Sequence, residues 1–224
     1  FYYVCPMMNT MNQAVLVIII ANVLFSMKGF KEHSFFNKYK FQIGSIVSGE
    51  KIRLLSSGFL HADWMHLGFN MYALYLFGNI VEGFLGASFF IIIYFGSLFA
   101  GGLYSLKYHR DEPYYSAVGA SGAVSGVVYS SILLYPSMEL FLFFIPIPIP
   151  GYIFGVGYLL YSIYGMKKQL GAIGHSAHLG GAIGGFLITL LLHPSLFITN
   201  KLLVMLLGVP IVLLLTFGDR LKKS

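Results

Sequence analysis

Ser121 and His178 are the residues of this sequence best suited to chemistry, because each lies in a glycine-rich frame inside a hydrophobic segment. The serine frame at 119–122 reads GASG, and the histidine frame at 177–181 reads AHLGG. A hydroxyl and an imidazole are costly to keep in apolar segments of membrane length, and such groups usually have a function. Together they could supply a nucleophile and a general base for acyl transfer.

We expect Ser121 to begin a short apolar helix. A helix start has unpaired backbone N–H groups and the positive end of the helix dipole, which stabilise negative charge on a nearby oxygen. Gly119 would let the backbone turn tightly beside a substrate. A frame this short is also typical of a helix-capping serine, so by itself it does not establish catalysis.

Glycines spaced four residues apart predict that the helices carrying Ser121 and His178 pack closely. Gly122 and Gly126 share one helix, and the 181–185 stretch of the other begins and ends with glycine. Such small-residue faces let two membrane helices approach until their backbones touch. The alternative is a histidine that only stabilises the bundle through a hydrogen bond between helices.

Three more polar side chains, His61, His66 and Asn70, fall within ten residues. His66 and Asn70 are four residues apart at the start of a hydrophobic segment, so they share one helical face. Donors that converge on one point are what an oxyanion site requires. Hydrogen bonding between helices, worth about 1 kcal/mol for each group, is the alternative.

The composition indicates an integral membrane protein. The 224 residues are 57% hydrophobic and 10% charged, whereas soluble domains have roughly 25% charged residues. A single cysteine excludes an internal disulfide and an all-cysteine metal site. The net charge of +6 fits flanks that contact anionic headgroups, and no basic run interleaved with aromatics indicates nucleic-acid binding.

Hydrophobic segments of membrane length predict an all-α, polytopic helix bundle in one domain. Residues 29–64 mix lysines and aromatics, which is typical of an interfacial excursion with short amphipathic helices. The alternating prolines of 144–151 exclude a continuous helix and predict an extended apolar loop. The expected spans are 11–28, 66–85, 88–107, 119–135, 151–166 and 176–193, with a seventh at 202–217 interrupted by Pro210.

These motifs, in this order, resemble the rhomboid intramembrane serine proteases over about residues 10–195. The resemblance rests on four elements spread along the predicted spans. They are Arg53 followed by His61, His66 and Asn70; Glu82 with Leu85-Gly86; Gly119-Ala120-Ser121-Gly122; and His175-Ser176-Ala177-His178-Leu179-Gly180-Gly181.

The resemblance implies a six-span rhomboid core in which Ser121 is the nucleophile and His178 the general base, without an aspartate. His66, Asn70 and the Ser121 backbone N–H would bind the oxyanion. His61 would support the same polar pocket and its water. The segment 29–64 would be a half-immersed first loop, 167–176 would cap the site, and 151–166 would be a mobile gate for substrate.

The sequence departs from the family pattern at two positions. The family often has an aromatic residue four positions after the serine, stacked on the catalytic imidazole, and here that residue is Ser125. The family pattern also has a tryptophan directly before the arginine, and here that position is Ile52. We interpret Arg53 and Glu82 as structural residues that anchor the first loop and a helix end.

Other mechanisms fit the sequence less well. A zinc protease needs His-Glu-x-x-His on a helix, and no such spacing occurs. An aspartyl protease needs aspartates within spans, but Asp63, Asp111 and Asp219 lie at flanks. A transporter would need a helix broken near mid-membrane. We therefore expect no metal and no cofactor. The remaining rival is an inactive rhomboid-like protein that binds or escorts transmembrane clients.

The expected partners are transmembrane substrates and the lipid bilayer, and the expected location is a bacterial cytoplasmic membrane. By the positive-inside rule, the active-site face would point to the cytoplasm, whereas bacterial members of the family usually open to the outside. Only Lys201 falls on the opposite face. The basic residues on the active-site face are Lys28, Lys31, Lys38, Lys40, Lys51, Arg53, Lys107, Arg110, Lys167 and Lys168, with Arg220, Lys222 and Lys223 if the seventh span exists.

Overall fold

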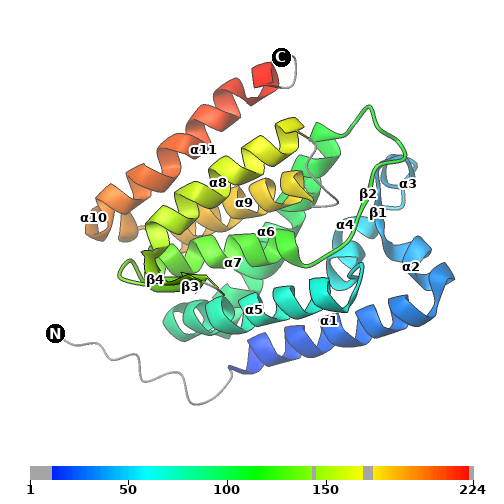
Figure 1. Ribbon diagram of the computed structural model, residues 1–224, viewed down its shortest axis with the longest axis horizontal. Helices are drawn as coiled ribbons and strands as arrows, with labels where there is room; N and C mark the ends of the chain where they lie inside the picture. Colours follow the sequence, from blue (N-terminus) through cyan, green and yellow to red (C-terminus); the bar gives the residue numbers. More distant parts are fainter. Residues whose placement is uncertain (1–11, 143–144, 169–173, 222–224) are drawn as a thin grey trace.

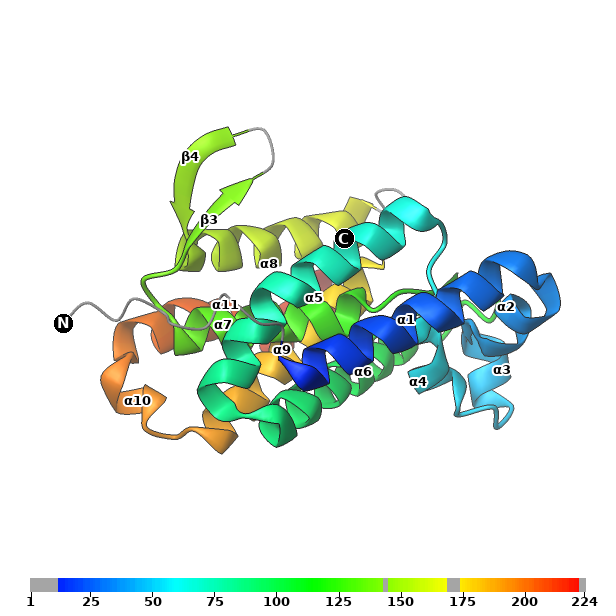
Figure 2. The ribbon, with the colours of Figure 1, turned by 90° about the horizontal axis from the view of Figure 1, so that it is seen from below.

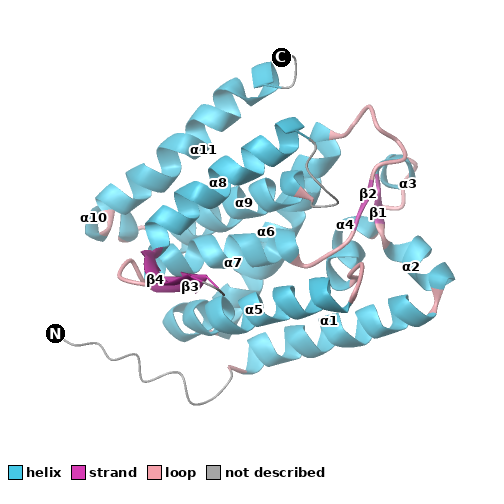
Figure 3. Cartoon of the chain, viewed as in Figure 1, coloured by secondary structure: helices cyan, strands magenta, loops and turns pink. Residues whose placement is uncertain are grey.

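The protein is a bundle of helices, described by a computed structural model over residues 12–142, 145–168 and 174–221 (Figures 1 and 3). This confirms the predicted all-α class. A helix covers most of every predicted span. These helices are α1 (Gln13–Lys31), α5 (Trp64–Leu85), α6 (Ala87–Tyr108), α7 (Ser121–Leu134), α8 (Gly151–Lys168), α9 (His175–Leu192) and α11 (Lys201–Leu221).

Three of these helices, α1, α6 and α9, are each long and apolar enough to cross a bilayer, within the described ranges. The central helix α7 has only 14 residues, a length of about 21 Å against roughly 30 Å of hydrocarbon. It packs against α5, α6, α8 and α9, and every residue from Gly122 to Leu134 is buried. A short helix enclosed in this way starts inside the bundle, and Ser121 is its first residue.

A buried carboxylate, that of Glu82, and a buried guanidinium, that of Arg53, hold outer segments of the protein in place. The Glu82 carboxylate accepts hydrogen bonds from the N–H groups of Ala14 and Val15, at 3.2 and 2.9 Å, and so caps the start of α1. The Arg53 guanidinium donates to the carbonyls of Asn37 and Lys40 at 2.8 and 2.9 Å. Both residues are therefore structural anchors, as predicted.

The first loop contains the short helices that its composition predicts. It consists of α2 (His33–Tyr39), β1 (Phe41–Gln42), α3 (Ile43–Val47), α4 (Arg53–Ser56) and the 3-10 turn η1 (Ser57–Phe59). Strand β1 pairs with β2 (Ser116–Ala117), which precedes α7. A small core of Phe41, Ile43, Ile46 and Leu54 holds this segment together. The first loop thereby supports the strand that leads into Ser121.

The proline-rich segment is a strand of a β-hairpin rather than a plain loop. Strands β3 (Glu139–Leu142) and β4 (Ile145–Pro150) are antiparallel, and the hairpin projects beside the start of α8 (Figure 2). Successive residues of a strand direct their N–H groups to opposite edges. Prolines at every second position therefore remove donors from one edge only and leave the other edge able to pair.

The C-terminal helices extend the bundle beyond the predicted core. After α10 (Leu196–Thr199), helix α11 continues through Pro210 instead of being interrupted there. Leu207 on α11 is fully buried, and Gly155 of α8 lies beneath it. Helix α11 thus covers part of α8, the helix predicted to be the gate.

Candidate active site

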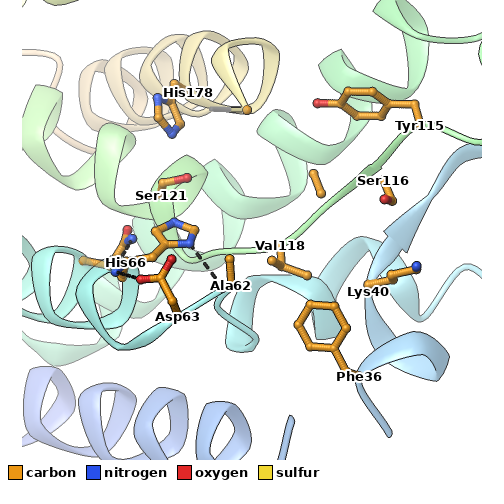
Figure 4. A pocket seen from close by; sticks show the side chains of 13 residues that line it. Phe36, Lys40, Ala62, Asp63, His66, Tyr115, Ser116, Val118, Ser121 and His178 are labelled. Carbon is orange, nitrogen blue, oxygen red and sulfur yellow. Dashed lines mark hydrogen bonds between the residues drawn. The ribbon is translucent and has the colours of Figure 1, made fainter. Parts of the chain in front are cut away.

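A pocket of about 580 Å³ collects four of the six predicted site residues. Ser121 of α7, His178 of α9 and His66 of α5 line it (Figure 4). Asn70, also of α5, is the fourth. Gly119 and His61 lie beneath this lining and support it, as described below. The remaining lining residues are Phe36, Lys40, Ala62, Asp63, Tyr115, Ser116, Ala117, Val118 and Gly174.

Ser121 and His178 face the same pocket from the first turns of two different helices (Figure 4). Among the residues that the structure describes, no hydrogen bond joins the two side chains. Catalytic hydrogen bonds are often long in unliganded enzymes and shorten only when substrate is bound. The Ser121 hydroxyl and the His178 imidazole therefore lie on adjoining helices, and both are accessible from the same pocket.

The predicted glycine faces bring α7 and α9 into backbone contact. A Cβ added to Gly181 would collide with the carbonyl group of Gly122. One turn further on, a Cβ on Gly185 would collide with the backbone of Gly126. Because backbone atoms cannot move aside as a flexible side chain can, only glycine is compatible with this spacing, and it sets the separation of Ser121 from His178.

Gly119 has two reasons to be glycine. Its φ of +129° belongs to a conformation that other residues rarely adopt. A Cβ at this position would also lie 2.7 Å from Cε1 and 2.8 Å from Nε2 of the His66 ring. The Gly119 N–H donates to the Ser57 carbonyl at 3.0 Å, which fixes the chain just before Ser121.

His66 and Asn70 lie on one face of α5, as their spacing predicts. The Asp63 carboxylate caps this helix by accepting from the His66 N–H at 2.8 Å. The Ala62 N–H donates to Nδ1 of His66 at 3.4 Å, which leaves the ring proton on Nε2, the atom next to Gly119. The Asn70 amide donates to the His66 carbonyl at 2.9 Å. The pocket therefore has two side-chain donors on one wall.

His61 supports the site from behind and is fully buried. Its Nε2 accepts from the Ala120 N–H at 3.3 Å, so the ring proton is on Nδ1 and points to the Ser26 hydroxyl at 2.9 Å. Ser26 in turn donates to the Phe59 carbonyl. Burial, followed by the neighbouring His66 imidazole, lowers the pKa of His61 to about 3. A neutral His61 thus holds the residue that precedes Ser121.

The sequence matches the Rhomboid domain family over residues 48–195, which is well over half of the chain. The chain belongs to the rhomboid family. It is 36% identical over 140 residues to Rhomboid protein 1, mitochondrial, of Saccharomyces cerevisiae, covering 61% of this chain and 40% of that protein. It is 30% identical over 182 residues to RHOMBOID-like protein 12, mitochondrial, of Arabidopsis thaliana, covering 75% of this chain and 54% of that protein.

A bacterial relative is named as an enzyme. Rhomboid protease GluP of Bacillus subtilis is 35% identical over 146 residues, which are 63% of this rhomboid chain and 26% of that protein. The chain thus spans about half or less of the length of these relatives. The family places it as a multi-pass membrane protein and supports protease activity. Because mitochondrial proteins are among the relatives, the expectation of a bacterial cytoplasmic membrane is not supported.

One residue near the site of this rhomboid chain has a position that its sequence did not reveal. Tyr158 on α8 stacks on His178, with ring centroids 5.9 Å apart and planes inclined by 19°. Its hydroxyl lies 2.6 Å from that of Ser125. A tyrosine within an apolar helix gives no sequence signal of such a role, because its partner is twenty residues further along the chain.

The predicted cap over the site lies partly outside the described residues. Of the stretch 167–176, residues 169–173 are not described, and Gly174 at its end lines the pocket. Ser176 pairs with Ser105 at 2.9 Å. The capping role of the segment stays a prediction.

Proposed function

We propose that this chain is an intramembrane serine endopeptidase that cleaves transmembrane segments of membrane proteins through Ser121 and His178. The observation that carries the proposal is the shared pocket, which holds a serine at a helix start and a histidine from the adjoining helix. Membership of the rhomboid family, and the relative named as a protease, agree with it.

The reaction would begin with attack of the Ser121 oxygen on the carbonyl carbon of the scissile peptide. His178 would accept the serine proton as the new C–O bond forms, and would then donate it to the amine as the C–N bond breaks. Water would hydrolyse the acyl-enzyme in the same way and regenerate the free hydroxyl. Without a carboxylate to orient the imidazole, this dyad should be slower than a triad.

The developing oxyanion would be bound by the Ser121 backbone N–H and by the side chains of His66 and Asn70. The first N–H groups of α7 have no carbonyl partner within the helix, and the helix dipole adds positive potential there. With Nδ1 of His66 occupied by the Ala62 N–H, the Nε2 proton is free to serve as the second donor. Asn70 can redirect its amide from the His66 carbonyl.

Substrates of this site would be transmembrane helices that can unwind near the cut, since the pocket opens beside an extended strand at Ser116–Ala117. Small or helix-weak residues at the cleavage point would fit this requirement. Helix α8 would be the gate through which such a segment enters from the lipid.

Cleavage of a transmembrane reporter in proteoliposomes tests the proposal. Ser121→Ala and His178→Ala should each abolish cleavage, and the double variant should be no worse because the two groups act as a unit. Ser131→Ala is a matched control on the same helix, since the Ser131 hydroxyl donates to the carbonyl of Val128, three residues earlier in α7. A fluorophosphonate should label Ser121 in a reaction that depends on His178.

Two results would contradict the proposal. One is cleavage that persists in Ser121→Ala, which would require a different nucleophile. The other is binding of the reporter by the unmodified protein without cleavage, which would instead support an inactive client-binding protein.

A further inference from the structure

Ser125 and Tyr158 form a short hydrogen-bond chain that ends at the nucleophile's own backbone. The Ser125 hydroxyl donates to the Ser121 carbonyl at 2.6 Å, so its single proton is used. At the 2.6 Å contact between the two hydroxyls, Tyr158 must therefore be the donor. The hydrogen bonds therefore run from the Tyr158 hydroxyl through the Ser125 hydroxyl to the Ser121 carbonyl.

A second hydrogen bond fixes α8 in the same register. The Tyr129 hydroxyl of α7 donates to the Gly155 carbonyl of α8. Tyr129 is one helical turn beyond Ser125, and Gly155 is about one turn before Tyr158, as antiparallel neighbours require. Two such bonds restrict sliding of α8 along α7 and so fix the height of the Tyr158 ring.

The Tyr158 ring faces both His178 and an aromatic residue of its own helix. Phe154 stacks on it at 5.9 Å with an inclination of 23°, and His178 lies at the same centroid distance with an inclination of 19°. Offset-stacked rings at 4.5–7 Å attract one another. The His175 ring is inclined by 74° to the His178 ring, with centroids 6.2 Å apart. Tyr158 is thus a flat aromatic neighbour of the imidazole and restricts its rotation.

We propose that Tyr158 is a positioning residue that holds the His178 imidazole toward Ser121 through ring stacking, while Ser125 anchors the tyrosine hydroxyl. The inference rests on the proposed function, because a positioned base matters only if His178 acts on Ser121. It explains how a chain with serine at position 125 retains an aromatic neighbour for the base. The ring comes from α8 instead of α7.

The test separates ring stacking, the hydroxyl bond and general stability. Tyr158→Phe keeps the ring and removes the hydroxyl, whereas Tyr158→Leu and Tyr158→Met keep apolar bulk without a flat ring. Tyr164→Leu is the matched control, since Tyr164 lies on the same helix and is 54% exposed. Each protein is purified in detergent, checked by thermal unfolding, and assayed for reporter cleavage and for the rate of fluorophosphonate labelling.

We expect the leucine and methionine variants to lose about 10- to 100-fold in kcat and in labelling rate, because a misplaced base costs about that much. The KM for the reporter should change less than about 3-fold, since Tyr158 acts through His178. Phenylalanine should retain activity within about 3-fold, and Tyr164→Leu should match the unmodified protein. The labelling reagent is small, so its rate is independent of substrate entry past α8.

Unchanged labelling rates in both Tyr158→Leu and Tyr158→Met would overturn the inference, as would a phenylalanine variant as slow as leucine. Ser121→Ala, run in parallel, keeps this outcome distinct from failure of the proposed function. If Ser121→Ala still cleaves, the dyad itself is wrong. If it is inactive while Tyr158→Leu labels and cleaves normally, only the positioning role is refuted.

Discussion

Gly181 on α9 lies directly against the backbone of Gly122, the residue that follows Ser121. The same relationship repeats one turn further on between Gly185 and Gly126, so the two helices touch along a line of glycines. His178 is three residues before Gly181, and Ser121 is immediately before Gly122. The separation of the two reactive groups is therefore set by how closely these backbones approach.

Gly181→Ala should destabilise the bundle and disable the site together. The added methyl group would collide with the Gly122 carbonyl, and relieving the collision would move α9 away from α7. Overpacking of this kind costs about 1–3 kcal/mol. Thermal unfolding and fluorophosphonate labelling measure the two effects in one preparation.

Gly157→Ala provides the control for the glycine prediction. A Cβ on Gly157 would meet nothing within 4 Å, and the residue lies in the exposed face of α8. This variant should be as stable as the unmodified protein or slightly more so, because alanine favours helix. Equal behaviour of the two alanine variants would contradict the close-packing explanation.

Much of this architecture could be predicted because its causes are local in sequence. Hydrophobic length located the helices, and glycine spacing identified the faces of α7 and α9 that meet. The position of Ser121 at a helix start followed from the same frame. In each case the pattern and the structure are related by helical periodicity alone, which a single sequence carries.

Features that depend on partners distant in sequence could not be predicted. The role of Tyr158 depends on how α8 is placed against α7 and α9, and nothing near it in sequence specifies that placement. The β-hairpin at 139–150 required a pairing between segments, although its extended conformation was evident from the prolines. Pro210 was expected to interrupt a span, yet α11 continues through it, since proline is tolerated inside membrane helices.

Acidification should destabilise the protein through His61. Its pKa of about 3 in the folded state lies below the ordinary 6.5, so the unfolded state binds more protons between these values. Stability is therefore full above pH 6.5 and is lost as the pH falls toward 3. As the pH falls from 7 to 5.5, His61 alone should lower the free energy of unfolding by about 1 kcal/mol.

Thermal unfolding of His61→Gln at several pH values checks this assignment. The variant should be less stable at pH 7, because the hydrogen bonds to Ala120 and Ser26 are altered, and its stability should depend less on pH. His33→Gln, which changes an exposed residue of α2, is the control. A His61→Gln protein with the same pH dependence as the unmodified chain would refute this role.

Arg53→Ala should weaken substrate binding more than it weakens chemistry. The guanidinium holds the carbonyls of Asn37 and Lys40, and Phe36 and Lys40 line the pocket. Losing these bonds would loosen that wall while leaving the glycine contact between α7 and α9 in place. We expect the KM for a transmembrane reporter to rise several-fold while fluorophosphonate labelling of Ser121 changes less than about 3-fold.

Two comparisons make the Arg53 prediction specific. Arg53→Lys should rescue little, because an ammonium cannot reproduce the planar fork that binds two carbonyls and Glu50. Lys51→Ala, an exposed neighbour, should behave as the unmodified protein does. A labelling rate that falls as steeply as substrate cleavage would place Arg53 in the support of the reactive groups instead.

The side of the membrane that the pocket faces can be settled with two single cysteines in a Cys5→Ser background. Tyr114 is 88% exposed and adjoins the pocket-lining Tyr115, whereas Ile147 is 64% exposed in the hairpin at the opposite end of α7. Basic residues cluster at the pocket end, and Lys40 lines the pocket itself. The positive-inside rule therefore predicts that the pocket faces the cytoplasm of a bacterial expression host.

The experiment applies a membrane-impermeant maleimide to intact cells. Ile147→Cys should then be labelled, and Tyr114→Cys should be protected until the cells are opened. The reverse pattern would mean that the folded first loop, held by Arg53 and the β1–β2 pair, overrides the charge bias in setting the orientation of the bundle.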